Sequence, residues 1–254
     1  MNDFDEVSMA FYQLIEAYCA RQLTYESDVL SAISGLISVY AERLNSTFIE
    51  GVCIGSARGM LWQNDDTNMA RQKPIVGRPS WSWTSQFGCR LGFWHPKFDT
   101  SKSMQISLAP HTNSSLTKLT VKSWTRWANL KYSGNGVDRS YYLDLPDGRY
   151  EKDEDFRCYP DNAYSLLDPS TYPHHVLCIF ATHFWGLLGE GGYAFIVTVP
   201  HPEIPDCFTR LGIRQMMKFG GSTLDFFGDM NEIGAVLESR RRVDGPDYTI
   251  QDLI

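Results

Sequence analysis

The chain has 254 residues, 43% of them hydrophobic, and a formal net charge of −7. A chain of this length and apolar content can bury a substantial core as one domain or two subdomains, which excludes a disordered protein. The acidic balance argues against a nucleic-acid-binding protein, because such a protein needs a basic face to neutralise phosphates.

Targeting signals and membrane spans are not evident in the sequence. No apolar run approaches the roughly 20 residues of a membrane-spanning helix, and residues 1–6 are acidic where a secretory signal is basic and then apolar. We therefore expect a soluble, cytoplasmic protein without a membrane span. The widely spaced cysteines form no CxxC pair and are expected to be buried small hydrophobic residues rather than disulfides or metal ligands. They are Cys19, Cys53, Cys89, Cys158, Cys178 and Cys207.

The first part of the chain has helical periodicity. Apolar residues follow the three-four spacing of an amphipathic helix from Phe4 to Tyr18. A second such stripe runs over residues 29–44, and a short connection between the two predicts an antiparallel helical pair. Gly35 inside the second helix costs roughly 1 kcal/mol relative to alanine. We therefore expect another element to pack closely against Gly35.

Residues 48–75 complete the predicted helical subdomain, which spans residues 1–75. The helix should end at Asn45. Residues 48–62 are less periodic, with glycines at positions 51, 55 and 59, and predict helical turns. The polar residues 63–73 predict a linker.

The segment RPSWSWTS, residues 78–85, alternates aromatic and polar side chains. Trp81 and Trp83 fall on one face of an extended segment, and Ser82 and Thr84 fall on the other, as in a half-buried strand. Two buried indoles can anchor a core. We predict a strand here, at the seam between the helical subdomain and a β-rich domain of residues 76–254.

Short alternating segments separated by Gly, Pro and Asn predict further strands. They cover residues 104–108, 116–124, 141–145, 176–185, 193–199 and 208–213, with a last edge strand at 248–250. Glycines at positions 189, 191 and 192 indicate a hairpin turn, residues 147–155 form an acidic segment expected to be mobile, and residues 225–240 predict a C-terminal helix. The fold class is α+β: an N-terminal helical hairpin packed on a mostly antiparallel, curled sheet, sandwich or barrel-like.

No motif specifies a reaction, a metal or a cofactor. The spacing of GVCIG, residues 51–55, is that of a nucleophile elbow with Cys53 in place of serine. The residues before it do not predict a buried parallel strand, so a Cys53-dependent hydrolase is only an alternative. Tryptophans can also stack on a ligand, which leaves a small-molecule-binding β domain as another alternative. Its pocket would be lined by Trp94, Trp124, Trp127 or Trp185.

Several segments together resemble one known family. Residues 21–36, RQLTYESDVLSAISGL, are similar to the "R-x-L-T-x-x-x-D-x-L-x-A-x-x-G" stretch found downstream of the heterokaryon-incompatibility domain in fungal proteins. RPSWSWTS resembles the "APSWSWAS" signature of that family, and residues 186–193 and 208–213 are similar to its late "GLLL…Y-R-R-x-G" region. The signature positions are Arg21, Leu23, Thr24, Asp28, Leu30, Gly35, Pro79, Trp81 and Trp83. Asp28 is expected to act at a helix N-terminus, or to pair with Arg21 or a partner.

The resemblance covers only the family's C-terminal region, since the "SYxWG" and "WIDxxCINQ" segments of the incompatibility domain have no counterpart. The chain is thus expected to be a truncated member, a separate product or an incomplete gene model. The resemblance implies a role in fungal allorecognition, in which non-self contact triggers programmed cell death. Because the death activity is associated with the absent domain, we expect a non-enzymatic regulatory or scaffold region. Its partner would be an incompatibility domain in cis or a related protein in trans. A fragment without independent activity is a further alternative.

Overall fold

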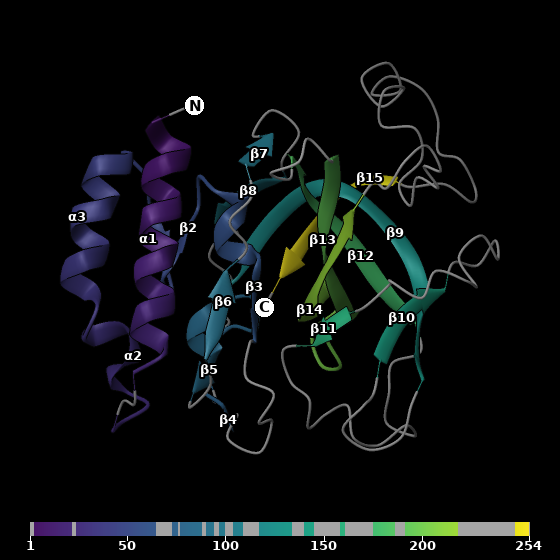
Figure 1. Cartoon of the computed structure of the whole chain (residues 1–254). Helices are drawn as coiled ribbons and strands as arrows, with labels where there is room; N and C mark the ends of the chain where they lie inside the picture. The colour runs from purple at the N-terminus through teal and green to yellow at the C-terminus, as the bar shows by residue number, and fades with distance from the viewer. Residues whose placement is uncertain are drawn as a thin grey trace.

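The computed structural model describes residues 3–21, 24–64, 73–75, 77–87, 90–93, 97–99, 104–108, 117–133, 140–144, 158–160, 175–185, 191–217 and 247–253. A layer of helices lies beside a curled β-sheet, and small two-stranded pairings lie between them (Figure 1). The predicted α+β class with a curled, mostly antiparallel sheet is confirmed. The acidic segment 147–155, the helix at 225–240, most of the linker and the first half of the hairpin turn predicted at 189–192 lie outside the described residues. Gly191 and Gly192, the second half of that turn, belong to a strand instead.

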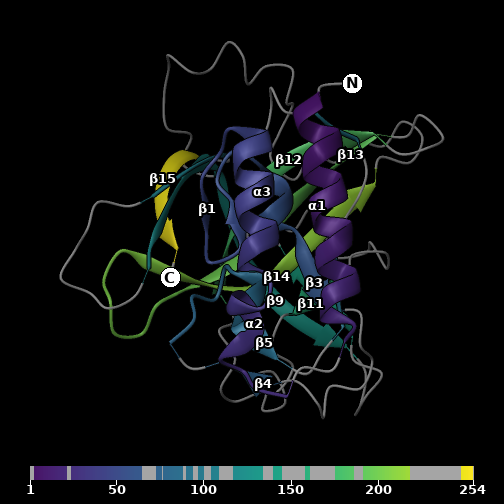
Figure 2. The ribbon, with the colours of Figure 1, turned by 90° about the vertical axis from the view of Figure 1, so that its left-hand side faces the viewer.

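The helical layer consists of α1 (Asp3–Cys19), α2 (Asp28–Ser31) and α3 (Ser34–Leu44). Helices α1 and α3 run side by side in opposite directions (Figures 1 and 2), as the sequence predicted. The second predicted helix is nevertheless split in two after Ser31. The hydroxyl of Ser34 donates to the Ser31 carbonyl at 2.9 Å, and such local serine bonds compete with helical backbone bonds.

The expectation for Gly35 is wrong, while the predicted helix end is confirmed. A Cβ placed on Gly35 would meet nothing within 4 Å, so no element packs on it. Asn45 ends α3 in the left-handed conformation, with φ 43° and ψ 48°. Asparagine tolerates that conformation, which is common at helix C-termini.

Residues 48–62 contain a short hairpin, turns and one 3-10 helix, so the predicted helical turns are confirmed at residues 57–60 and wrong at the hairpin. Strands β1 (Phe48–Ile49) and β2 (Val52–Cys53) form a hairpin, and β3 begins at Trp62 (Trp62–Asn64). The connecting Glu50 and Gly51 have φ of 46° and 78°. Two successive positive φ angles make the tight turn that suits a two-residue hairpin. One short 3-10 helix, η1 (Ala57–Met60), follows.

The predicted strand at residues 78–85 is also wrong. The segment forms a turn closed by a 3.0 Å bond from the Ser82 N–H to the Pro79 carbonyl, and then the 3-10 helix η3 (Trp83–Ser85). Ser82 caps this helix, since its hydroxyl accepts from the Thr84 N–H at 3.0 Å. Burial of both tryptophans is confirmed, but Ser82 and Thr84 are buried as well. The alternation therefore did not separate a buried face from an exposed one.

Two short pairings flank this segment. Strand β4 (Lys73–Pro74) pairs with β5 (Gln86–Phe87), and β3 pairs with β6 (Leu91–Phe93). The remaining strands of the described chain form one nine-stranded sheet. They are β7 (Lys97–Asp99), β8 (Gln105–Leu108), β9 (Leu119–Ser133), β10 (Ser140–Asp144), β11 (Cys158–Pro160), β12 (His175–Trp185), β13 (Gly191–Pro200), β14 (Cys207–Met217) and β15 (Asp247–Leu253). The strands predicted in this region are confirmed, and most are longer than predicted.

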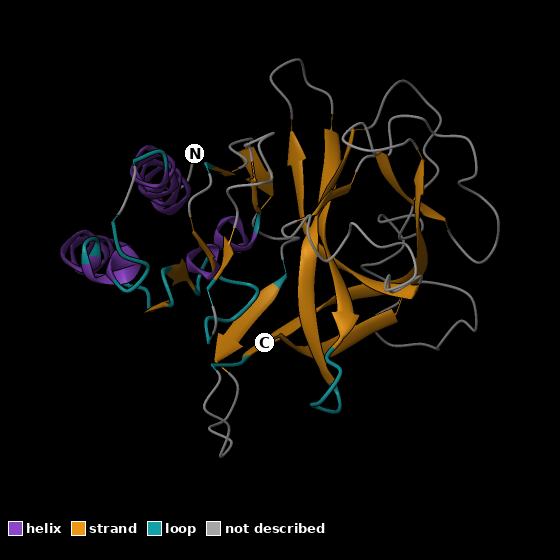
Figure 3. Ribbon diagram, turned by 90° about the horizontal axis from the view of Figure 1, so that it is seen from below, coloured by secondary structure: helices purple, strands orange, loops and turns teal. Residues whose placement is uncertain are grey.

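The long strand β9 closes the sheet on itself. Its residues 119–125 pair with β15 and its residues 125–129 pair with β12, so the order β9-β15-β14-β13-β12 returns to β9. Figure 1 shows β9 as an arc over the other strands, and Figure 3 shows the curl from below. The predicted last edge strand is corrected: β15 lies between β9 and β14. It meets β14 in two parallel register pairs only.

The helices and the sheet share one hydrophobic cluster. It contains Phe11 and Ile15 from α1, both tryptophans of residues 78–85, and Ile179 and Ile196 from the sheet. Strands β12 and β13 are buried on both faces, because Val176, Cys178 and Phe180 on the opposite face of β12 belong to a second cluster. Residues 78–85 therefore lie where the helical layer meets the sheet.

Candidate functional site

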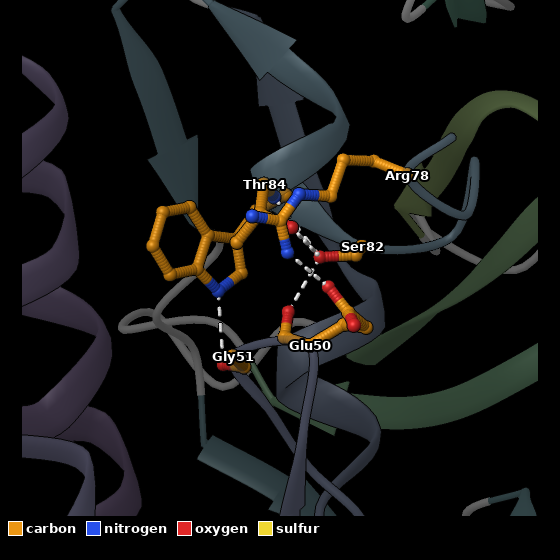
Figure 4. Close-up of polar contacts among 6 residues, drawn as sticks. Glu50, Gly51, Arg78, Ser82 and Thr84 are labelled. Carbon is orange, nitrogen blue, oxygen red and sulfur yellow. Dashed lines mark hydrogen bonds and ion pairs between the residues drawn. The ribbon is translucent and has the colours of Figure 1, made fainter. Parts of the chain in front are cut away.

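The segment of residues 78–85, hereafter the tryptophan segment, binds the turn of Glu50 and Gly51 (Figure 4). The hydroxyl of Ser82 donates to the Glu50 carbonyl at 2.5 Å, and the indole N–H of Trp83 donates to the Gly51 carbonyl at 2.9 Å. Arg78 donates to the Glu50 carboxylate at 2.5 Å. Three side chains of the segment thus donate hydrogen bonds to oxygen atoms of the same two-residue turn.

Gly51 is required at this contact for two independent reasons. Its φ of 78° lies in the left-handed region that favours glycine, and a Cβ there would come within 2.7 Å of the Trp83 ring. The indole therefore rests against the backbone of the turn. Ser82 is further held by Thr84, with 2.7 Å between the two hydroxyl oxygens.

The same segment contacts the sheet through Ser80 and Trp81. The Ser80 hydroxyl accepts from the Arg210 N–H of β14 at 2.9 Å, and the Trp81 carbonyl accepts from the Trp62 indole of β3 at 3.0 Å. The buried Arg210 guanidinium lies 3.8 Å from the centre of the Trp62 ring and donates to the Trp62 carbonyl. A cation over an indole face is attracted by the ring quadrupole. The contacts of the tryptophan segment thus join β14 and β3.

Tyr18 connects the helices to this segment. Its ring meets Trp83 edge-on, with 6.4 Å between ring centres, and its hydroxyl donates to the Val29 carbonyl at 2.9 Å. Burial raises the pKa of the Tyr18 phenol above its ordinary value, and the neighbouring Cys19 and Asp28 act in the same direction. Tyr18 is therefore an uncharged spacer between α1, α2 and the tryptophan segment.

The signature positions fall into two groups. Pro79, Trp81 and Trp83 are buried. The positions from residues 21–36 are mostly exposed or half-buried: Arg21, Thr24, Asp28 and Gly35 are exposed, Leu30 is half-buried, and Leu23 lies outside the described residues. Among the signature positions that the structure describes, the buried ones are therefore those of the first group.

The exposed signature stretch includes a large apolar side chain shortly before α2. Tyr25 is 64% exposed there. The Ser27 hydroxyl donates to the Asp28 carboxylate at 3.0 Å, at the first residue of α2. The described ion pairs do not include one between Asp28 and Arg21. The sequence did not single out Tyr25, although its position inside the signature stretch is a signal that could have found it.

Cys53 lies in β2 directly after the hairpin turn, rather than in a turn between a strand and a helix. Its side chain is fully buried and donates to the Ser46 hydroxyl at 3.3 Å, while its backbone N–H donates to the Tyr12 hydroxyl at 3.0 Å. Burial raises the pKa of the Cys53 thiol, and the bonds from Ser46 and the Gly55 backbone only partly oppose this. Since the thiolate is the nucleophile, these surroundings disfavour reactivity.

The two described tryptophans proposed for a pocket do not face each other. Trp124 and Trp127 lie three positions apart on β9, and an odd spacing places side chains on opposite faces of a strand. Trp124 packs against the second core cluster. Trp127 is 38% exposed and stacks on His175, with 4.6 Å between ring centres and 1° between planes. Trp94 and the side chain of Trp185 lie outside the described residues.

One buried ion pair could not be foreseen from sequence. The Arg58 guanidinium, fully buried in η1, donates to the Asp5 carboxylate of α1 at 2.8 Å, across 53 positions of chain. Arg126, Arg210 and Arg214 are buried as well. No sequence pattern predicts that these arginines are buried, because their burial depends on packing between segments far apart in the chain.

The described residues contain no group of three or more His, Cys, Asp or Glu side chains arranged to hold a metal ion. None of the described helices has the length and apolar character needed to cross a membrane. In comparisons with known proteins, no family model, curated protein or solved structure matches the chain.

Proposed function

We propose that this chain is a non-enzymatic interaction module that serves as the regulatory or scaffold region of a fungal heterokaryon-incompatibility protein. The observation that carries the proposal is the division of the signature positions. Pro79, Trp81 and Trp83 are buried, whereas Arg21, Thr24, Asp28 and Gly35 are exposed, as is Tyr25 in the same stretch. A protein that acts by binding needs a rigid support and an accessible surface.

The buried part supplies the support. The tryptophan segment is hydrogen-bonded to the β1–β2 turn through Ser82 and Trp83 and to β14 through Ser80. Trp83 also contacts Tyr18 of α1. These residues are engaged in packing and in hydrogen bonds to the backbone. A structural role in the fold is therefore enough to explain why they match the family signature.

The exposed part supplies the surface. Tyrosine and arginine are enriched at protein interfaces, where a large rigid side chain can anchor a partner. In the sequence Tyr25 lies between Arg21 and Asp28, and all three residues are exposed. We assign the partner contact to the described residues 24–28 at the start of α2, hereafter the Tyr25 turn.

The partner proposed from the family resemblance is an incompatibility domain, joined in cis or supplied in trans by a related protein. In this role the module would act in the cytoplasm and modulate the cell-death reaction of that domain. Burial of the exposed Tyr25 side chain against the partner would provide the affinity of the complex. The module itself would catalyse no reaction.

Co-expression in fungal cells tests the proposal. An incompatibility domain from a protein with the same downstream signature is induced with and without this chain, and surviving cells are counted. We expect the chain to change survival and Tyr25→Ala to reduce the change. Val39→Ala, at an exposed apolar position of α3, is the matched control and should behave as wild type. Equal survival with and without the chain would contradict the proposal.

A ligand-binding role is the second candidate, favoured by the exposed stack of Trp127 on His175. Quenching of tryptophan fluorescence by a panel of small aromatic and sugar ligands tests it. Quenching that disappears in Trp127→Phe would support this candidate over the interaction module.

The Cys53 hydrolase alternative predicts rapid alkylation of the native thiol at neutral pH, whereas the burial of Cys53 predicts alkylation only after unfolding.

A further inference from the structure

A lysine and a cysteine far apart in the chain meet at one end of the sheet. The ammonium nitrogen of Lys118 lies 3.4 Å from the sulfur of Cys207, to which it donates, across 89 positions of chain. Cys207 is buried at the first residue of β14, and Lys118 is half-buried one residue before β9. An amine and a thiol in contact form a pair of reactive groups rather than an isolated cysteine.

This pair lies across the shortest described pairing of the closed sheet. Strand β15 lies between β9 and β14, and its Leu253 is the register partner of both Leu119 and Phe208. Strands β14 and β15 share only the pairs of Cys207 with Asp252 and of Phe208 with Leu253. Lys118 and Cys207 therefore reach each other directly beside the last residues of β15.

We propose that Lys118 and Cys207 form an oxidation-dependent covalent cross-link, a sulfenamide between Nζ and Sγ, with a peroxide as the oxidant. In the first step the thiol is oxidised by peroxide to a sulfenic acid. One peroxide oxygen is transferred to sulfur, the O–O bond breaks, and the other oxygen leaves as water.

The second step needs no further oxidant. The Lys118 amine attacks the sulfenic sulfur, the S–N bond forms, and the S–O bond breaks. The hydroxyl group leaves with one amine proton as water. Sulfenic acids are known to condense with thiols and with backbone nitrogen in this way. In sum, thiol, amine and one peroxide give the sulfenamide and two waters.

The position of Cys207 suits this chemistry. It follows a loop in which Pro202, Glu203 and Asp206 are exposed, and Cys207 itself keeps 4% of its surface exposed. The neighbour of the equally buried Cys53 is the Ser46 hydroxyl, a much weaker nucleophile than an amine. A sulfenic acid at position 207 would meet its amine in place, without a change of fold.

The cross-link would fasten β9 to β14 and hold β15 between them. A covalent link that closes a loop of this size restricts the unfolded chain, and we expect the Tm to rise on the order of 10 °C. Hydrogen exchange of the β15 amides should slow at the same time, because release of β15 requires β9 and β14 to separate.

Peptide mapping by mass spectrometry tests the proposal. The purified chain is treated with hydrogen peroxide, free thiols are alkylated, and the protein is digested without cleavage at lysine. We expect a cross-linked pair of peptides containing positions 118 and 207, lighter by two hydrogens than the sum of the free peptides. A thiol reductant should restore both peptides and the original Tm.

Two variants complete the test. Lys118→Arg keeps the positive charge and a donor to sulfur but removes the nucleophilic amine, so Cys207 should accumulate as sulfenic or sulfinic acid with no cross-link. Cys19→Ser, at a half-buried cysteine of α1, should cross-link as wild type does. A wild-type protein in which Cys207 stays alkylatable, is oxidised without cross-linking, or retains oxygen in the link would overturn the proposal, whatever the variants do.

Discussion

The carbonyl of Gly51 accepts a hydrogen bond from the indole N–H of Trp83 at 2.9 Å, and the indole ring lies within 2.7 Å of the position that a Cβ on Gly51 would take. The turn and the ring therefore form one unit, although they lie 32 positions apart. Through this unit the β1–β2 hairpin is fixed against the tryptophan segment, which also contacts α1 and β14.

Gly51→Ala should destabilise the protein by about 2–4 kcal/mol, because it adds the strain of a left-handed alanine to a clash with the Trp83 ring. Gly77→Ala is the matched control: its φ of 84° carries the same strain, but nothing lies within 4 Å of its Cβ. It should cost about 1–2 kcal/mol. Urea unfolding followed by circular dichroism measures both, and equal losses would show that the ring contact contributes nothing.

Trp83→Ala should cost about 3–5 kcal/mol, the range for removing a buried aromatic side chain. Trp127→Ala, which removes the same side chain from a partly exposed position, should cost less than about 1.5 kcal/mol. The midpoint of thermal unfolding separates the two variants. An unchanged midpoint for Trp83→Ala would show that this indole does not anchor the core.

The two ion pairs should respond differently to removal of the carboxylate. Asp5→Asn leaves the fully buried Arg58 charge without its counterion and should cost about 3–5 kcal/mol. Glu50→Gln breaks a pair whose side chains are about a quarter exposed and should cost about 1 kcal/mol or less. Urea unfolding at low and moderate salt measures the losses. A Glu50→Gln loss as large as that of Asp5→Asn would contradict this assignment.

Alkaline pH should destabilise the protein through Tyr12. Burial raises the pKa of the Tyr12 phenol far above its ordinary value, so above about pH 10 the unfolded chain loses this proton while the folded chain keeps it. The stabilising contribution of this phenol is therefore complete below the pKa that Tyr12 has in the unfolded chain, and it is lost as the pH rises above that pKa. Tyr12→Phe should be less stable at pH 7, because the Cys53 N–H loses its acceptor, yet should decline less steeply between pH 9 and 11. Parallel slopes would contradict this role.

Sequence periodicity predicted the elements whose form depends on local patterning. Helix α1 shows a long three-four stripe, and β12 and β13 are long apolar runs, so all three were placed correctly. Periodicity could not predict that β9 closes the sheet, because β9 pairs with two strands that lie far from it in the sequence.

The errors concentrate where side chains satisfy backbone groups. The alternation in residues 78–85 resembled a strand, yet Ser82 caps a 3-10 helix and its hydroxyl also reaches the Glu50 carbonyl. The glycine at position 51 was interpreted as part of a helical or catalytic turn, whereas its role is set by the ring of Trp83. Trp81 and Trp83 were recognised as core residues because large aromatic side chains are usually buried, whatever backbone carries them.

Direct binding of the chain to an incompatibility domain tests the central claim. Isothermal titration calorimetry with the purified domain of a protein that carries the same downstream signature should give saturable binding, weakened at least tenfold by Tyr25→Ala and unchanged by Val39→Ala. Absence of binding by the wild-type chain, or equal affinities for Tyr25→Ala and wild type, would contradict an interaction module that acts through the Tyr25 turn.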